Sequence, residues 1–260
     1  MLLTMSDVGV RVVELRERKR GGKLPTVLGR QVKEQAWPLR HLDFSLEDGQ
    51  TVYVLDLATH RPALFLRLAT GTLRCDEGTI TLPPRSLLAR PAGRRQVRSL
   101  SVGQSIRMMA GLYGMGDKAI DRRFDEMVDF AEVSRVVNRP IESQHRQVIA
   151  QVAFAAAICS RAELIAFDRC ALVGDRRFRN KCARRIAELK KSGTGFVVFS
   201  PDARQVLELA DRGLVLDGDH SREVPPAELA GLLIADKKEQ RQRHRQRRRR
   251  RRKQEGDSEV

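Results

Sequence analysis

LDLATHRPALFLRLATGTL, residues Leu55–Leu73, decides the fold class of this 260-residue chain, because it continues a strand into a turn and a helix. The strand is the apolar run Thr51–Leu55. The helix is indicated by apolar residues that recur on one face, namely Leu64, Phe65, Leu68 and Ala69. This is the order in which a phosphate-binding loop is recognised. Where its motif G-x-x-x-x-G-K-S/T would stand, however, the chain reads DLATHRPA, Asp56–Ala63.

The charge of the chain is concentrated at one end. Of the net charge of +16, ten positive charges lie in Arg241–Lys253, which contains no acidic residue, so the rest of the chain carries +6. This segment offers no apolar surface to offset the entropy of ordering, and its charges repel one another. We therefore predict a disordered polybasic tail over residues 237–260. Its targets would be anionic, either nucleic acid bound through counterion release or anionic lipid head groups. A solvated tail that only aids solubility is the alternative.

Cysteine usage and the apolar segments indicate a cytoplasmic protein. The four cysteines show no C-x-x-C spacing, so buried thiols in a reducing compartment are expected. The N-terminal residues lack the pattern of a signal peptide. The longest apolar run, Val148–Cys159, is too short to span a bilayer and is interrupted by Gln151. Any membrane association would come through a partner or through the tail.

The remaining pattern predicts a mixed α/β domain over residues 1–236, with a helical subdomain at about residues 98–160. Further strands are expected at Val10–Leu15, Leu39–Leu46, Gly78–Leu82, Leu164–Phe167, Phe196–Phe199 and, as the last one, Gly213–Leu216. Helices are expected within Ser105–Asn138, including Arg122–Val137, and at Gln147–Cys159, Phe178–Lys191 and Arg204–Ala210. Helices that alternate with buried strands after about residue 145 favour a parallel sheet.

Three stretches carry a resemblance to a known family. They are ALVGDRRFRNKC (Ala171–Cys182), LATGTLRCDEGTI (Leu68–Ile80), and MMAGLYGM (Met108–Met115) followed by IDRRFDEMVDFAEV (Ile120–Val133). In their order and spacing, over roughly residues 8–220, they resemble the ATP-binding subunit of ABC transporters that export capsular and cell-surface polysaccharides. The resemblance implies an ABC-type nucleotide-binding domain. Such a domain has a parallel core like that of P-loop NTPases, an antiparallel β edge and a helical subdomain.

The resemblance also shows what the phosphate-binding residues of the family have become. The glycines of its Walker A loop, which let backbone N–H groups converge on phosphate, correspond to Asp56, Thr59 and Arg61. The phosphate-binding lysine corresponds to Pro62, and the Mg²⁺-binding hydroxyl corresponds to Ala63. Proline in the first turn of a helix costs little, so the helix is expected to survive while phosphate binding is not. The glutamine of the Q-loop corresponds to Gln96.

The catalytic positions are substituted in the same way. Asp168 falls on the metal-associated aspartate of Walker B, but Arg169 follows where the family has its catalytic glutamate. A guanidinium has no acceptor and does not deprotonate, so it cannot act as a general base. The remaining positions are His145 and Gln147 for the serine and glycine of the signature, Pro201 for the switch histidine, and Asp175 for the D-loop aspartate. We expect no catalytic residue, no metal and weak or absent binding of the ATP and Mg²⁺ that the family uses.

Several hypotheses remain open. The first is a degenerate subunit with a structural or regulatory role on a membrane permease, paired with an intact ATPase paralogue or with itself, and peripheral on the inner membrane. The alternative is a basic-tailed binding protein for nucleic acid or anionic lipid. A true ATPase would need another phosphate loop, and Arg16–Pro25 (RERKRGGKLP) lacks the framing strand and helix. Arg169 would either join Arg61 and His60 in an anion site or pair with Asp168 or Asp175.

Overall fold

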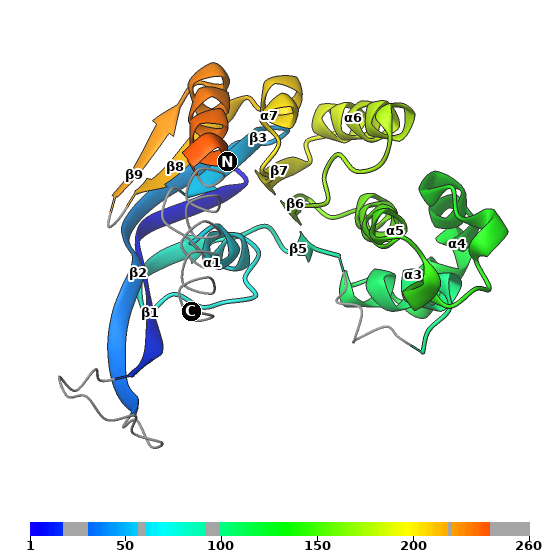
Figure 1. The fold of residues 1–260 in the computed structure, drawn as a ribbon, viewed down its shortest axis with the longest axis horizontal. Coiled ribbons are helices and arrows are strands. Elements are labelled where there is room, and N and C mark those ends of the chain that lie inside the picture. Colours follow the sequence, from blue (N-terminus) through cyan, green and yellow to red (C-terminus); the bar gives the residue numbers. More distant parts are fainter. Residues whose placement is uncertain (18–30, 57–60, 92–98, 218–219, 240–260) are drawn as a thin grey trace, which may run out of the picture.

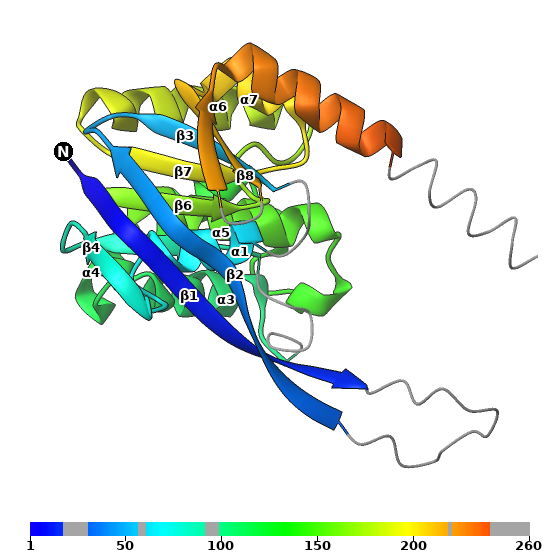
Figure 2. The same ribbon diagram turned by 90° about the vertical axis from the view of Figure 1, so that its left-hand side faces the viewer.

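Two sheets form the scaffold of the protein. The computed structural model describes residues 1–17, 31–56, 61–91, 99–217 and 220–239 (Figure 1). The smaller sheet is antiparallel, with the order β2-β1-β4, and consists of β1 (Leu3–Glu17), β2 (Gln31–Leu46) and β4 (Glu77–Thr81). β4 pairs with β1 only as far as Gly9. Beyond that point β1 and β2 continue as a two-stranded ribbon that extends past the body of the molecule (Figure 2).

The larger sheet is the parallel core that the sequence predicts. Its order is β5-β6-β7-β3-β8-β9, in which every neighbouring pair is parallel except β8 and β9. The strands are β3 (Thr51–Asp56), β5 (Ser86–Ala89), β6 (Leu164–Asp168), β7 (Gly195–Phe199), β8 (Arg212–Asp217) and β9 (His220–Val224). β3 lies between β7 and β8, which are more than 130 residues away in the sequence.

Both faces of this sheet are covered, which explains why its strands are apolar along their whole length. Val52 and Val54 of β3 face the smaller sheet and the helix α1 (Arg61–Leu68). Tyr53 and Leu55 face the opposite layer of helices. That layer contains α5 (Arg146–Cys159), α6 (Arg176–Lys191) and α7 (Ala203–Leu209), as Figure 1 shows.

A column of aromatic rings ties the helical layer to the sheet. Phe154 of α5 stacks on Phe167 of β6, with ring centroids 5.2 Å apart, and Phe167 stacks on Phe196 of β7 at 6.0 Å. Phe130 continues the column at 5.8 Å from Phe154. Each pair contributes about 0.5–1.5 kcal/mol beyond the area that it buries. The column fixes α5 above β6 and β7.

The helices α3 (Val102–Leu112) and α4 (Asp117–Ala131) pack with α5. The predicted C-terminal end of the helix expected at Arg122–Val137 is wrong. Glu132 takes a left-handed conformation (φ 57°) that terminates α4 after Ala131. A short 3-10 turn, Ser134–Val136, follows instead. Within the described ranges, no helix combines the length and the apolar character that crossing a membrane requires.

The C-terminal region also departs from the prediction. Gly213–Leu216 was predicted to be the last strand, but it lies in β8, and a further strand, β9, follows β8 and pairs with it. A helix that was not predicted then occupies residues 226–239. Its first residue is Pro226, and Leu229, Ala230 and Leu233 are buried against the core. Lys237–Glu239, predicted to be disordered, therefore belong to this helix. The rest of the predicted tail, residues 240–260, lies outside the described residues, as does most of Arg16–Pro25.

Lys181 of α6 joins the core to α4. Its Nζ donates to the carbonyl oxygens of Asp129 (3.3 Å) and Phe130 (2.9 Å) in the last turn of α4 and pairs with Oε1 of Glu132 at 3.3 Å. The ammonium also lies 4.6 Å from the ring centroid of Phe130. A cation at a helix C-terminus interacts favourably with the helix dipole. Lys181 therefore caps α4 from the neighbouring helix.

We predict that Lys181→Met lowers the free energy of unfolding by about 1–3 kcal/mol, because three hydrogen bonds to the end of α4 are lost while the apolar stem is kept. Urea denaturation followed by circular dichroism measures the change. Arg184→Met, at an exposed position in the middle of the same helix, is the matched control and should stay within about 0.5 kcal/mol of the wild type. Equal effects of the two substitutions would contradict the assigned role of Lys181.

Candidate functional site

The parallel register brings the ends of three strands to one edge of the core sheet. Tyr53 of β3 pairs with Val198 of β7, and Val198 pairs with Phe167 of β6. The carboxyl ends of these strands therefore lie side by side. We use the name carboxyl edge for the residues found there, namely Asp56, Asp168, Arg169 and Ser200–Asp202. In open α/β sheets ligands bind at this kind of edge.

The helix α1 begins at this edge, as the sequence predicts. Arg61 is its first residue, Pro62 is buried and Ala63 is exposed. Phe65, Leu66, Leu68 and Ala69 bury the opposite face of the helix. Neither the pyrrolidine ring nor the methyl group in the first turn offers an ammonium or a hydroxyl to a ligand. Asp56 is partly buried at the end of β3, whereas Thr59, His60 and Gln96 lie outside the described residues.

Arg169 directly follows the last residue of β6. Its backbone N–H donates to the carbonyl oxygen of Phe199 (2.9 Å), and its guanidinium lies 5.1 Å from the ring centroid of Phe199. Its Nε lies 3.9 Å from Oδ1 of Asp168, so of the two pairings considered from the sequence the structure has the one with Asp168. The Arg169 side chain is 67% exposed and that of Asp168 is 19% exposed. Arg169 is also left-handed (φ 59°), a conformation that costs about 1–2 kcal/mol for such a residue.

The turn after β7 is shaped by hydrogen bonds that start α7. The backbone N–H of Asp202 donates to Oγ of Ser200 (3.3 Å), and Oδ1 of Asp202 accepts from the backbone N–H of Arg204 (3.1 Å). Pro201 lies between them and is exposed. Its side chain has no donor or acceptor, so this position offers no proton-transfer group.

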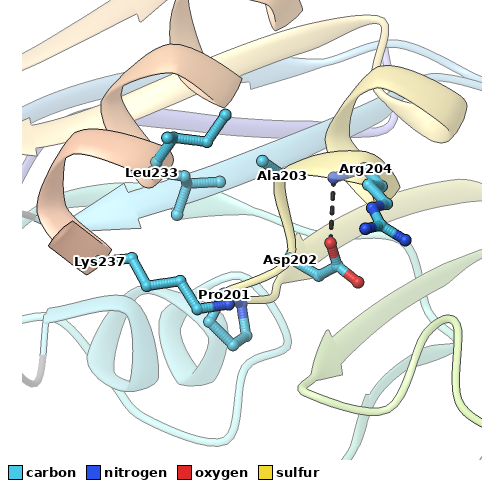
Figure 3. Close-up of a pocket in the computed structure, with 7 residues that line it drawn as sticks. Pro201, Asp202, Ala203, Arg204, Leu233 and Lys237 are labelled. Atoms are coloured by element: carbon cyan, nitrogen blue, oxygen red, sulfur yellow. Dashed lines mark hydrogen bonds between the residues drawn. The ribbon is translucent and has the colours of Figure 1, made fainter. Parts of the chain in front are cut away.

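A pocket of about 500 Å³ lies beside this turn, between the start of α7 and the helix at residues 226–239 (Figure 3). Leu233 and Ile234 supply apolar lining, and Lys237 and Arg204 supply two cations. The sequence reasoning missed this pocket because it did not predict the second helix. The signal was present in the spacing of Leu229, Ala230 and Leu233 after a proline.

The predicted signature residues and the predicted D-loop aspartate lie near one another. His145 caps α5, because its Nδ1 accepts from the backbone N–H of Gln147 (3.2 Å). Asp175 caps α6, with Oδ1 accepting from the backbone N–H of Phe178 (2.8 Å). A Cβ atom placed on Gly174 would lie 3.3 Å from Nε2 of Gln147, which puts the two segments in contact. Each capping side chain satisfies a backbone donor of its own helix.

The described groups at the carboxyl edge do not match the donor set of a magnesium triphosphate. Mg²⁺ requires oxygen ligands in octahedral geometry, usually from one or two carboxylates, a hydroxyl and phosphate. Here Asp168 faces the cation of Arg169, and Ala63 has no oxygen in its side chain. In the part of the chain that the structure describes, no three His, Cys, Asp or Glu side chains gather into a metal site.

Three of the four cysteines are buried, as expected, and Cys75 is half-buried. Sγ of Cys170 donates to the carbonyl oxygen of Ala89 (3.2 Å). Burial raises the pKa of Cys170 and raises the pKa values of Cys159 and Cys182 to about 12. A raised pKa keeps these thiols protonated at neutral pH. Because the thiolate is the reactive form, nucleophilic chemistry at these cysteines is disfavoured.

We predict that iodoacetamide at pH 8 modifies one thiol per folded chain, at Cys75, and four per chain after unfolding in urea. The three buried thiols combine poor access with a pKa well above the pH of the reaction. Mass spectrometry of the labelled protein measures the stoichiometry. Cys75→Ser should abolish labelling of the folded chain, and rapid labelling of Cys170 in that variant would contradict the burial described here.

We further predict that His145→Ala lowers the free energy of unfolding by about 1 kcal/mol, because the N-cap of α5 is lost, whereas His145→Ser keeps a capping oxygen and is nearly neutral. Urea denaturation is the measurement. His220→Ala, at an exposed position of β9, serves as the control histidine. A similar loss for the alanine and serine variants at position 145 would show that the cap does not act as described.

No protein-family model matches the chain. The chain is 25% identical over 199 residues to the teichoic acids export ATP-binding protein TagH of Listeria innocua. The aligned residues cover 76% of this chain and 59% of that protein. It is 23% identical over 190 residues to the O-antigen export system ATP-binding protein RfbB of Klebsiella pneumoniae, covering 73% and 77% respectively. The chain thus spans 59% of the length of the Listeria relatives that it matches.

Solved structures confirm the fold class. The chain matches the ATP-binding subunit of an ABC transporter with a TM-score of 0.65 at 15% identity, over 86% of this chain and 90% of that chain. A dimeric ATP-binding cassette in a post-hydrolysis state, bound to ADP and Pi, matches with the same TM-score and identity. This match covers 86% of the present chain and 99% of that chain. The fold is that of an ABC ATPase nucleotide-binding domain, and the resemblance to polysaccharide-export ATP-binding proteins that the sequence predicts is confirmed.

Proposed function

We propose that this chain is a degenerate ATP-binding-subunit homologue of a polysaccharide-export ABC transporter, which neither binds Mg-ATP tightly nor hydrolyses it. Its relatives in teichoic acid and O-antigen export support the export context. Its role is structural or regulatory, beside a membrane permease and a second subunit. The protein would act in the cytoplasm, peripherally on the inner membrane.

The single observation that carries the proposal is the side chain at the end of β6. In the family that the sequence resembles, this position holds the carboxylate that activates water. Arg169 occupies it here, stacked on Phe199 and facing Asp168. A permanently protonated guanidinium cannot accept a proton from water. It also places a positive charge 3.9 Å from Asp168, the residue that falls on the metal-associated aspartate of the family.

Independent positions support the same reading. Pro62 and Ala63 begin α1 without an ammonium or hydroxyl group, and Pro201 follows β7 without an imidazole. At the position of the signature serine, His145 has no hydroxyl to offer to a neighbouring subunit. Its acceptor nitrogen Nδ1 instead caps α5. Because that position serves the partner's nucleotide site in the family, a partner would gain no signature from this chain. A scaffolding or regulatory role therefore fits better than half of a working ATPase pair.

We predict that the full chain releases no phosphate from Mg-ATP above the rate of the buffer, and that Arg169→Glu does not restore hydrolysis, because Pro62 and Ala63 still provide no phosphate contacts. A coupled phosphate assay at millimolar ATP is the measurement. Asp168→Asn, prepared identically, is the control: phosphate release by a contaminating ATPase would be the same in both preparations, whereas activity of this chain would be lost in the variant. Magnesium-dependent release by the wild type that Asp168→Asn abolishes would overturn the proposal.

A further inference from the structure

Two exposed apolar side chains belong to the helices that form the walls of one pocket. The pocket lies between α7 and the helix at residues 226–239 (Figure 3). Leu207 of α7 is 63% exposed, and Ile234 of the C-terminal helix is 49% exposed. Within the described ranges, five large apolar residues are exposed in this way. Two of these five are therefore found on neighbouring helices.

Helical spacing places both side chains on the side of the pocket. Leu207 follows Ala203 by four residues and Arg204 by three, and both of those residues line the pocket. Ile234 lines it as well, as does Lys237, three residues later. Residues three and four apart lie on the same face of a helix. We use the name C-terminal patch for the exposed residues Arg204, Leu207, Ile234, Lys237 and Lys238.

The acidic residues of the C-terminal helix lie on another side of it. A helix turns by about 100° per residue, so Lys238 lies about 40° around the helix from Ile234, whereas Glu228, Asp236 and Glu239 lie about 120–160° away. Glu228 is also paired, since its Oε1 lies 2.7 Å from Nη1 of Arg222. The exposed face around Ile234 therefore combines an apolar side chain with lysine and carries no carboxylate of its own helix.

The patch itself has little net charge, and the chain that follows it supplies the positive charge. Asp202 and Glu208 border the patch on α7 and offset part of its charge. Figure 2 shows that the C-terminal helix leads away from the core sheet toward Glu239, the last described residue. Two residues later the sequence enters Arg241–Lys253, which contains ten cationic side chains and no acidic one. This basic segment is thus joined covalently to the edge of the patch.

Exposed apolar side chains next to a polybasic segment select the kind of anionic partner. A bilayer surface binds both, because apolar side chains enter the boundary between head groups and acyl chains while cations contact anionic head groups. Stable peripheral anchoring usually combines two such signals. Nucleic acid binds basic segments through its phosphates and stacks its bases on aromatic rings. The C-terminal patch contains no aromatic ring, and leucine and isoleucine add nothing to contacts with phosphate.

We infer that the C-terminal patch and the basic segment Arg241–Lys253 together bind the surface of an anionic membrane, with Leu207 and Ile234 inserted at the level of the lipid head groups. This contact requires neither a nucleotide nor a permease, so the inference goes beyond the proposed function. Of the two anionic ligands that the sequence leaves open for the tail, it favours lipid over nucleic acid.

Matched variants of the full chain separate the apolar contribution from the charge. The patch variant carries Leu207→Gln and Ile234→Gln. The control variant carries Val13→Gln on β1 and Leu112→Gln at the end of α3, at side chains that are 61% and 75% exposed. Neither variant changes the net charge. All four positions are exposed, so both variants are expected to fold like the wild type.

Co-sedimentation with lipid vesicles at low salt gives the readout. The wild type should bind vesicles of equal parts phosphatidylglycerol and phosphatidylcholine, and should not bind vesicles of phosphatidylcholine alone. The patch variant should bind the anionic vesicles at least about tenfold more weakly than the wild type, and the control should stay within about twofold. Replacing the arginines of Arg247–Arg252 by glutamine should weaken binding at least about hundredfold. Equal binding by the patch and control variants, or no preference for the anionic vesicles, would overturn the inference.

A fluorescent label reports insertion directly. Ile234→Cys, combined with Cys75→Ser to remove the half-buried thiol, places an environment-sensitive fluorophore at position 234. Anionic vesicles should shift its emission to shorter wavelength, because the label enters an apolar environment. The same label on Leu112→Cys, in the same background, should show no shift. An unshifted spectrum at position 234 when the chain is bound to vesicles would contradict insertion of the patch.

Nucleic acid is the competing ligand and has its own outcome. Affinity for a DNA duplex, measured by fluorescence anisotropy, should be the same in the wild type and the patch variant, because the substituted side chains carry no charge. A loss of DNA affinity in the patch variant as large as its loss for vesicles would assign the patch to nucleic acid and overturn the inference. None of these results depends on whether the chain hydrolyses ATP, so the inference and the proposed function can fail separately.

Discussion

The parallel register of β6, β7 and β3 is the constraint on which the rest of the molecule depends. It brings residues from three distant segments, Asp168, Pro201 and Asp56, to one edge. Below that edge, the strands are buried between two layers and held by the ring column of Phe154, Phe167 and Phe196. The fold is therefore stabilised by apolar burial, whose strength does not depend on the residues beyond the strand ends. Those residues can lose one chemistry and acquire another while the scaffold persists.

The buried strands could be predicted from the sequence because strands covered on both faces are apolar throughout. The runs TVYVL, LIAF and FVVF are of this kind. The strand β5 has only four residues, and β9 is the polar edge strand HSREV, so neither carries such a pattern. The end of α4 depends on the left-handed Glu132, which no periodicity indicates. The helix at residues 226–239 did have a readable pattern in Leu229, Ala230 and Leu233, and it was overlooked.

The positions of the candidate site were assigned from the sequence through the family-like segments that flank them, and these assignments stay predictions. The contacts that each side chain makes at these positions could not be predicted from the sequence. That His145 caps α5, and that Arg169 lies on Phe199, are properties of the folded chain.

The central claim is that the carboxyl edge keeps the frame of a nucleotide site without the groups that hold a triphosphate. Titration calorimetry of the full chain with Mg-ATP tests it most directly, with the same titration in chelator as the reference. The account predicts no saturable heat at protein concentrations of tens of micromolar, and at most weak, salt-sensitive heat that is the same with and without magnesium. A saturable 1:1 isotherm in the micromolar range that the chelator abolishes would contradict it.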